Sequence, residues 1–314
     1  MRPPISGFTY HIVPDIQKDP SEAGRLLAPF LRDGYWKTFQ IPPVGSRDAA
    51  AKLGAVLRLA GVRPTFDIGG TVTDGELNLQ SPDPVIRAKA LETAEELVDQ
   101  AYLIGARVAD FNPGPDPGPE TRTQELANLA DSLARLCDYA AEKAADQGGR
   151  RNGEWPEVLT ISLEHFDREV DKRRILGPTE EAAEFIRGLR RRVPNIGLTM
   201  DLSHLVLLGE DPKEAVTIAR SYVTNAHLSN CIFGDRNDPR WGDRHPPFFV
   251  PGGTVDAGTI EAFVSGLQEI GYFAPNSSGS GMLTFQVKPA PEEDPFRVAA
   301  GCRRLLEEVL AGIA

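Results

Sequence analysis

Four residues that could bind a metal ion each close a short, mostly apolar run of the sequence: Glu164, Asp201, His227 and Gln286. Two carboxylates, one imidazole and one amide oxygen form a mixed donor set that suits a hard to borderline divalent cation. A single acid at the end of a strand is usually a helix cap or a solvated group, whereas four donors at consecutive strand ends favour a metal site. We therefore expect one divalent ion, Mn²⁺ first, with Mg²⁺, Co²⁺ or Zn²⁺ as alternatives.

A second group of reactive side chains follows in the segment Asp243-Arg244-His245. Asp243 and His245 alternate with Arg244, so in an extended segment both would point the same way. His245 would then act as a catalytic acid or base that Asp243 orients, with Arg244 available to bind an anionic oxygen of the substrate. Two alternatives stay open, namely a second metal held by Asp243 and His245, or a solvated loop with a local salt bridge.

Two further candidates stand next to predicted ligands. His165 directly follows Glu164, so in a regular strand it would face the helix layer, whereas a curl at the strand end would bring it into the pocket as a catalytic residue. Lys288 lies two residues beyond Gln286 and shares its direction, which makes it a candidate for binding a substrate oxyanion.

The chain positions these residues by alternating predicted strands and helices. We predict strands at 5–12, 36–41, 65–68, 107–111, 158–164, 196–201, 222–228 and 282–287, and helices at 20–31, 46–60, 84–104, 120–145, 179–192, 211–220, 258–270 and 295–313. A Gly- and Arg-rich exposed turn is expected at 147–155. Eight strand and helix units with short connections predict one (β/α)8 TIM barrel domain over residues 1–314, whose strand ends meet at one rim. An open, doubly wound sheet is the alternative.

Composition narrows the class of partner and the compartment. The 34 Lys and Arg against 45 Asp and Glu give a formal net charge of -11, which disfavours a nucleic-acid partner. Three widely spaced cysteines indicate neither a disulfide framework nor a thiolate zinc site, and so favour a reducing compartment. The sequence shows no signal peptide and no apolar run of the ~20 residues that a membrane helix needs. We therefore expect a soluble cytoplasmic protein without a membrane partner.

Four short segments carry a resemblance to a known family. In order and spacing they resemble the metal strands of the xylose-isomerase-like barrel superfamily, which includes D-tagatose 3-epimerase-type sugar epimerases, inositol-pathway dehydratases and endonuclease IV. The segments are Leu163-Glu164, Met200-Asp201-Leu202-Ser203-His204, Asn225-Ala226-His227-Leu228 and Phe285-Gln286-Val287-Lys288-Pro289. The resemblance implies that Glu164, Asp201 and His227 are metal ligands and that His204 contacts the substrate.

One position departs from the epimerase pattern. The epimerases end strand eight with a glutamate that is both a ligand and a proton-transfer base, whereas this chain has Gln286. An amide can coordinate a metal through its oxygen but cannot take up a proton near neutral pH. The resemblance therefore implies a metal site without the paired-carboxylate chemistry.

Several functions follow from this pattern. The first is a metal-dependent enzyme that removes a proton next to the carbonyl of a sugar or keto-sugar and stabilises the enediolate. With Gln286 present, lyase chemistry becomes attractive, and the chain is similar to the large subunit of C-glycoside deglycosidases, which cleave 3-keto-C-glycosides and work with a small β-rich subunit.

Three alternatives stand beside this lyase. A sugar isomerase or epimerase would use Glu164 or a histidine for proton transfer. An endonuclease IV-like AP endonuclease is favoured by Asp243 and His245 but opposed by the net charge. A non-catalytic sugar-binding subunit would hold a structural metal. We expect a small sugar or glycoside as the ligand and an oligomeric assembly.

Overall fold

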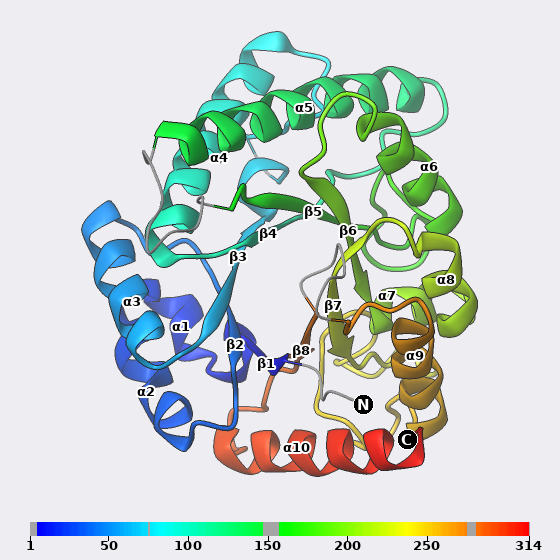
Figure 1. The fold of residues 1–314 in the computed structure, drawn as a ribbon. Helices are drawn as coiled ribbons and strands as arrows, with labels where there is room; N and C mark the ends of the chain where they lie inside the picture. Colours follow the sequence, from blue (N-terminus) through cyan, green and yellow to red (C-terminus); the bar gives the residue numbers. More distant parts are fainter. Residues whose placement is uncertain (1–4, 75, 147–156, 275–280, 314) are drawn as a thin grey trace.

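Eight parallel strands close into a barrel in the order β1 to β8, with β8 hydrogen-bonded to β1 (Figure 1). The computed structural model describes residues 5–74, 76–146, 157–274 and 281–313, so the turn predicted at 147–155 lies outside them. The strands are β1 Ile5–Thr9, β2 Thr38–Ile41, β3 Arg63–Gly69, β4 Val108–Phe111, β5 Thr160–Glu164, β6 Ile196–Asp201, β7 Val223–Ser229 and β8 Met282–Gln286. The predicted (β/α)8 barrel is confirmed, and pairing of β1 with β8 rules out the open sheet.

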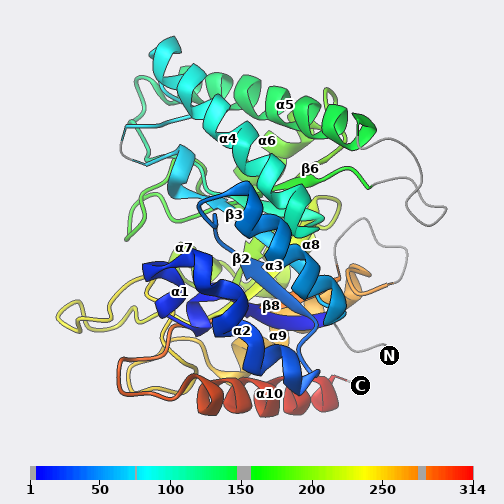
Figure 2. The same cartoon turned by 90° about the vertical axis from the view of Figure 1, so that its left-hand side faces the viewer.

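Helices surround the barrel and follow the strands in sequence. They are α1 Asp15–Lys18, α2 Ala23–Asp33, α3 Arg47–Leu59, α4 Pro84–Ile104, α5 Arg122–Asp146, α6 Thr179–Leu189, α7 Leu202–Leu208, α8 Pro212–Ala219, α9 Ala257–Glu269 and α10 Pro295–Gly312, with short 3-10 helices η1 Tyr10–Ile12, η2 Pro20–Glu22 and η3 Gly70–Val72. Figure 2 shows α4 and α5 side by side on one flank of the barrel. In the part of the chain that the structure describes, none of the helices combines the length and the apolar character needed to cross a membrane.

Two of the differences from the predicted elements lie next to the mouth of the barrel. The first strand was expected to reach residue 12, but it ends at Thr9 and the chain turns into η1. The helix α7 was not predicted, although Asp201 caps it directly after β6. Both differences lie where the chain leaves the barrel. The sequence pattern does not fix these points, because a strand can end wherever a turn satisfies its backbone hydrogen bonds.

The two faces of the strands differ in character because successive side chains in a strand alternate between them. Phe8, Phe39, Phe66 and Phe285 are fully buried and belong to the hydrophobic core. The other face carries small hydroxyl groups into the barrel, where Ser162 contacts residues of the two following strands, Thr199 at 2.6 Å and Thr224 at 2.7 Å. Two residues further along, the same face carries Glu164 on β5, Asp201 on β6 and Gln286 on β8.

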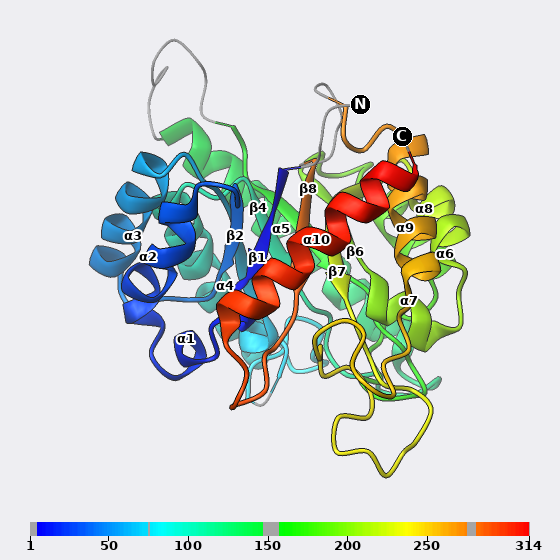
Figure 3. The same cartoon turned by 90° about the horizontal axis from the view of Figure 1, so that it is seen from below.

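The strands all end at the same side of the barrel because they are parallel. The connection between β7 and α9, yellow in Figure 3, extends beyond this end. Figures 2 and 3 also place α1 and α7 at this end. The loops after β1, β6 and β7 are therefore placed to build a site over the barrel mouth.

Candidate functional site

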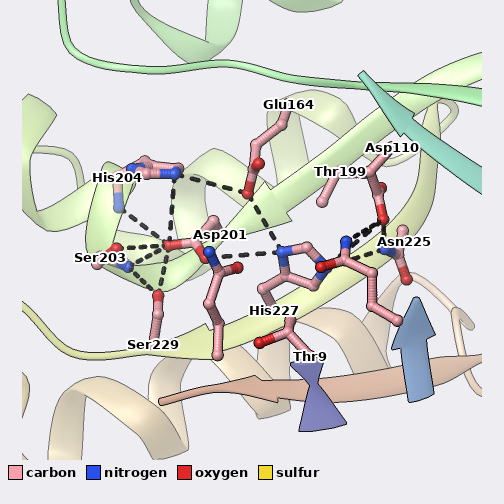
Figure 4. A network of polar contacts seen from close by, with 12 residues as sticks. Thr9, Asp110, Glu164, Thr199, Asp201, Ser203, His204, Asn225, His227 and Ser229 are labelled. Atoms are coloured by element: carbon pink, nitrogen blue, oxygen red, sulfur yellow. Dashed lines mark hydrogen bonds and ion pairs between the residues drawn. The ribbon is translucent and has the colours of Figure 1, made fainter. Parts of the chain in front are cut away.

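Glu164 and Asp201 end the strands β5 and β6, His227 lies two residues before the end of the adjacent strand β7, and their side chains point toward one another (Figure 4). One donor atom from each lies within 4.8 Å of the others, and all three residues are buried. His227 Nδ1 lies 3.2 Å from Glu164 Oε1 and 3.7 Å from Asp201 Oδ2. These three residues could hold one metal ion with two oxygen donors and one nitrogen donor.

The two oxygens of Asp201 have different surroundings. Oδ1 accepts hydrogen bonds from the backbone N–H of Ser203 at 2.8 Å, from its hydroxyl at 2.7 Å and from the hydroxyl of Ser229. The first of these bonds caps α7 and fixes the direction of the carboxylate. Oδ2 is buried without a hydrogen-bond partner. Such an orphaned oxygen beside Glu164 and His227 fits a cation, because burying an unpaired charged oxygen is costly.

His227 is held from below by a polar network inside the barrel. Asn225 Nδ2 lies 3.1 Å from His227 Nε2 and 3.0 Å from both carboxylate oxygens of Asp110. Gln40 Nε2 donates to the same carboxylate at 2.7 Å, and Thr199 also donates to it. The network fixes the ring so that Nδ1 faces Glu164 and Asp201. Sequence reasoning missed Asp110 because it lies within β4 and not at a strand end.

His204 stands in the first turn of α7, beside the three candidate ligands. Its Nε2 lies 3.5 Å from Glu164 Oε1, its Nδ1 lies 3.8 Å from Asp243 Oδ1, and its ring packs on Phe166 with 4.1 Å between centroids. Burial alone would lower the pKa of His204, but Asp243, Asp201 and Glu164 outweigh it and raise that pKa to about 10. The same carboxylates would be neutralised by a bound cation.

The charges around His227 couple metal binding to the release of a proton from its ring. Burial would lower the pKa of His227, but Glu164, Asp110 and Asp201 raise it to about 9. His204 and His227 together hold the pKa of Glu164 below its ordinary value despite burial. A metal ligand must offer an unprotonated nitrogen, so binding of an ion at Nδ1 of His227 would release a proton.

The loop after β7 brings Asp243 and His245 into contact. His245 Nδ1 lies 3.2 Å from Asp243 Oδ1, and Asp243 is also held by Ser203 Oγ at 2.9 Å and by Lys172 Nζ at 3.1 Å. The segment is not extended as the sequence suggested, because His245 has a φ of 53°. Both residues are buried, and they form a tethered pair beside His204 and not a solvated salt bridge.

Gln286, the last residue of β8, contacts His245. Its Nε2 lies 2.9 Å from His245 Nε2, while its Oε1 is buried without a hydrogen-bond partner. The free Oε1 keeps the predicted role of Gln286 as a fourth ligand open. Among the described residues, Glu164, Asp201 and His227 form the one group of three acidic, histidine or cysteine donors at metal-binding distance. This finding gives no support to a second metal at Asp243 and His245.

A cavity of about 300 Å³ opens above these residues. Of the predicted site residues, Glu164, His204, Asp243, Arg244, His245, Gln286 and Lys288 line it. Arg244 and Lys288 are exposed, and the backbone N–H of Lys288 donates to the carbonyl oxygen of His245 at 2.7 Å. This bond brings both cationic residues to the same side of the mouth.

His165 lies outside this cavity. Its Nε2 is 2.8 Å from the hydroxyl of Thr179 at the start of α6, and the ring is fully buried. The curl that would have turned it toward the substrate does not occur, because β5 stays regular through Glu164 and the next side chain faces the helix layer. The expectation that His165 reaches the pocket is therefore wrong.

The site residues predicted from the sequence do not include the wall that β1 to β4 and the segments after them provide. The cavity is lined there by Tyr10, His11, Gln17, Gln40, Asp67, Gly70 and Asn112. Tyr10 Oη donates to Asp67 Oδ2 at 2.9 Å. Burial raises the pKa of Asp67 to about 7, although the bond from Tyr10 opposes the rise. Its place near the end of β3 was the signal that could have identified Asp67.

Comparisons with known proteins agree with this architecture. The model of a family described as xylose isomerase-like TIM barrel matches residues 35–297, which is most of the chain. None of the curated proteins matches the chain.

Solved structures share the fold at low sequence identity. A D-tagatose 3-epimerase-like protein aligns with a TM-score of 0.71 and 17% identity, over 98% of this chain and 99% of that chain. An L-ribulose 3-epimerase aligns with a TM-score of 0.71 and 17% identity, over 99% and 97%. The IOLI protein, solved with a binding zinc atom, aligns with a TM-score of 0.69 and 13% identity, over 98% and 99%.

Proposed function

The chain belongs to the xylose isomerase-like TIM barrel family, and we propose that it is a metal-dependent enzyme that isomerises or epimerises a sugar. The observation that carries this proposal is the meeting of Glu164, Asp201 and His227 beside a polar cavity at the mouth of the barrel. Similar solved structures named as sugar 3-epimerases support an isomerase over a lyase.

We propose one divalent ion held by Glu164, Asp201 and His227, with Gln286 as a further oxygen donor. The orphaned Asp201 Oδ2 and Gln286 Oε1 support this donor set. Mn²⁺ is the first candidate because three of the four donors are oxygens, and Zn²⁺ is the second because the IOLI structure holds zinc. When bound, such an ion would act as a Lewis acid that stabilises negative charge on neighbouring oxygens of the sugar.

His245 is the proposed proton-transfer group. Asp243 Oδ1 lies 3.2 Å from Nδ1 of the ring, so its negative charge favours the proton on Nδ1 and leaves Nε2 as the basic atom. Gln286 Nε2 donates to this atom, so the amide must release Nε2 before His245 can take a proton from carbon. Arg244 and Lys288 would contact substrate oxygens at the mouth. Asp243 thus positions the base, and Gln286 competes with the substrate for it.

Proton exchange in D₂O tests this function. We expect the Mn²⁺-loaded protein to incorporate deuterium next to the carbonyl of a ketose such as D-fructose or D-tagatose, without cleaving a carbon bond. His245→Asn should lower the exchange rate by about 10²- to 10⁴-fold, the usual contribution of an acid or base. Elemental analysis should show the same metal content in both proteins. Absence of exchange on a panel of ketohexoses and ketopentoses by fully loaded wild type would refute the proposal.

A lyase remains the second candidate because of one observation. Gln286, paired with His245, cannot serve as the carboxylate base that the epimerase pattern places on strand eight. A single histidine base leaves a second reaction to compare with isomerisation. It is the cleavage of a 3-keto-C-glycoside, with this chain as the large subunit of a two-subunit enzyme. Release of aglycone from such a substrate, with or without a small β-rich subunit, and no deuterium exchange on ketoses would favour it.

We also propose a reducing compartment, the cytoplasm, as the place of action. Cys137, Cys231 and Cys302 are unpaired and buried, which supports this proposal. Redox-controlled proteolysis or mass spectrometry of the protein from cells would test it.

A further inference from the structure

The side of the cavity formed by β1 to β4 carries polar groups to which the proposed mechanism gives no role. In the closed order of eight strands, β3 lies across the barrel from β7, so Asp67 faces the cavity from the side opposite His227. Its neighbours on this wall include three neutral amides, Gln17, Gln40 and Asn112. The wall therefore offers hydrogen bonds on the side of the cavity that lies across the barrel from β7.

The carboxylate of Asp67 is held in one orientation. Tyr10 Oη donates to Oδ2 at 2.9 Å, from the 3-10 helix that follows β1. The other oxygen, Oδ1, occupies space that only a glycine at position 69 leaves free, because a Cβ there would lie 2.4 Å from it. Gly69 also has a φ of 41°, which favours glycine. Tyr10 and Gly69, which are far apart in sequence, thus fix the orientation of the Asp67 carboxylate.

Oδ1 is left free to bind a ligand. Within the described parts of the chain, Tyr10 is the residue whose side chain donates to this carboxylate, and it uses Oδ2. The wall carries no Lys or Arg among the residues of β1 to β4 that line the cavity, and burial lowers the pKa of His11 to about 3, which keeps that ring neutral. Arg244 and Lys288 belong instead to the loops after β7 and β8.

We propose that Asp67 determines substrate specificity by accepting a hydrogen bond at Oδ1 from a hydroxyl group of the sugar, at the end that lies against β1 to β4. This inference rests on the proposed function of the same site. In its unprotonated form the carboxylate can only accept at Oδ1, so its ligand must then bring a donor. A phosphate or carboxylate placed against the unprotonated Asp67 would meet a like charge, whereas a hydroxyl group would not. The substrate class is therefore a sugar that is neutral and hydroxylated at this end.

Ligand binding with and without single hydroxyl groups tests the inference. The Mn²⁺-loaded protein is titrated by calorimetry with D-fructose and with its 4-, 5- and 6-deoxy analogues. A hydrogen bond between a hydroxyl and a charged group is worth about 1.5–3 kcal/mol, so wild type should bind one analogue about 10- to 100-fold more weakly than D-fructose. Asp67→Ala should remove this discrimination, and Tyr10→Phe should reduce it while the carboxylate remains.

The matched control is Asp74→Asn. Asp74 follows β3 in the same loop region, pairs with Arg174 and does not line the cavity, so its replacement should leave the discrimination unchanged. Equal discrimination in wild type and Asp67→Ala, or none in wild type, would overturn the inference. If Asp67→Ala does not fold, unchanged discrimination in Tyr10→Phe would overturn it.

Exchange of deuterium on the same sugars separates this inference from the proposed function. Binding with Asp67-dependent discrimination but no exchange would refute the isomerase proposal and leave the role of Asp67 intact. Exchange without Asp67-dependent discrimination would support the isomerase proposal and refute the role of Asp67. If none of these sugars binds to the wild-type protein, the role of Asp67 as a sugar contact is overturned.

Discussion

Replacement of His165 by alanine should destabilise the fold and leave the rate per folded molecule unchanged. The ring is fully buried, and its Nε2–H donates to Thr179 Oγ1 at 2.8 Å, since the Thr179 hydroxyl itself donates to Glu210. Truncation of a large buried side chain to alanine costs about 2–5 kcal/mol, and the lost hydrogen bond costs about 1 kcal/mol. We therefore expect a loss of about 3–6 kcal/mol.

For a chain of this size, 1 kcal/mol corresponds to about 2 °C in the unfolding midpoint, so the expected fall is roughly 6–12 °C. Urea unfolding of the metal-free protein, monitored by circular dichroism, measures the free energy of unfolding directly. Deuterium exchange on the best ketose measures activity. Both are normalised to the metal content of the folded protein, because His165 is the neighbour of Glu164 in β5.

Thr179→Val is the comparison variant because it removes the partner of His165 and keeps the ring. It also removes the hydroxyl bond to Glu210, so it should lose stability as well, by about 2–4 kcal/mol. If His165 is structural, both variants are less stable and equally active. A fall in exchange of 10²-fold or more in His165→Ala alone, at equal metal content, would show that the ring takes part in catalysis and would refute this reasoning.

Three further outcomes are expected. Mn²⁺ at 100 times its Kd should stabilise the metal-free protein by about 2.7 kcal/mol. Asp201→Asn should abolish most of this gain, measured as the rise in unfolding temperature on adding Mn²⁺. An equal rise in the wild type and the variant would contradict the metal site. Burial raises the pKa of Asp67 from 3.8 to about 7, so the folded protein holds a proton that the unfolded chain has released. This stabilisation is complete below about pH 4 and is lost as the pH rises through about 7, by at most about 1.4 kcal/mol per pH unit. Asp67→Asn should flatten the profile of urea midpoints in metal-free protein, and an unchanged profile would assign the pH dependence to other groups. Gly54→Ala should destabilise the fold by a few kcal/mol because the added Cβ would lie 2.2 Å from the Leu103 carbonyl oxygen. Gly188→Ala has open space around the added Cβ and should stabilise α6 by up to about 1 kcal/mol. If both variants raised the urea midpoint, helix propensity would outweigh packing at position 54.

The sequence by itself determined the architecture and the candidate metal ligands. Strand and helix patterns repeat eight times, and parallel strands must end at one side of a closed barrel. Side chains in a strand alternate between its two faces, so Glu164, Asp201 and His227, each near the end of its strand, could be predicted to face the same rim. The regular alternation that predicts these positions also places His165 on the opposite face.

Only the tertiary structure decided which partners these residues take. Gln286 pairs with His245, which lies 41 residues away, and Tyr10 pairs with Asp67 from another strand end, 57 residues away. The path of the loop after β7, including the positive φ of His245, has no periodic pattern that could be extrapolated from sequence. Local alternation fixes the direction of a side chain, whereas contacts between distant segments depend on strand register and loop path, which the whole packed barrel sets.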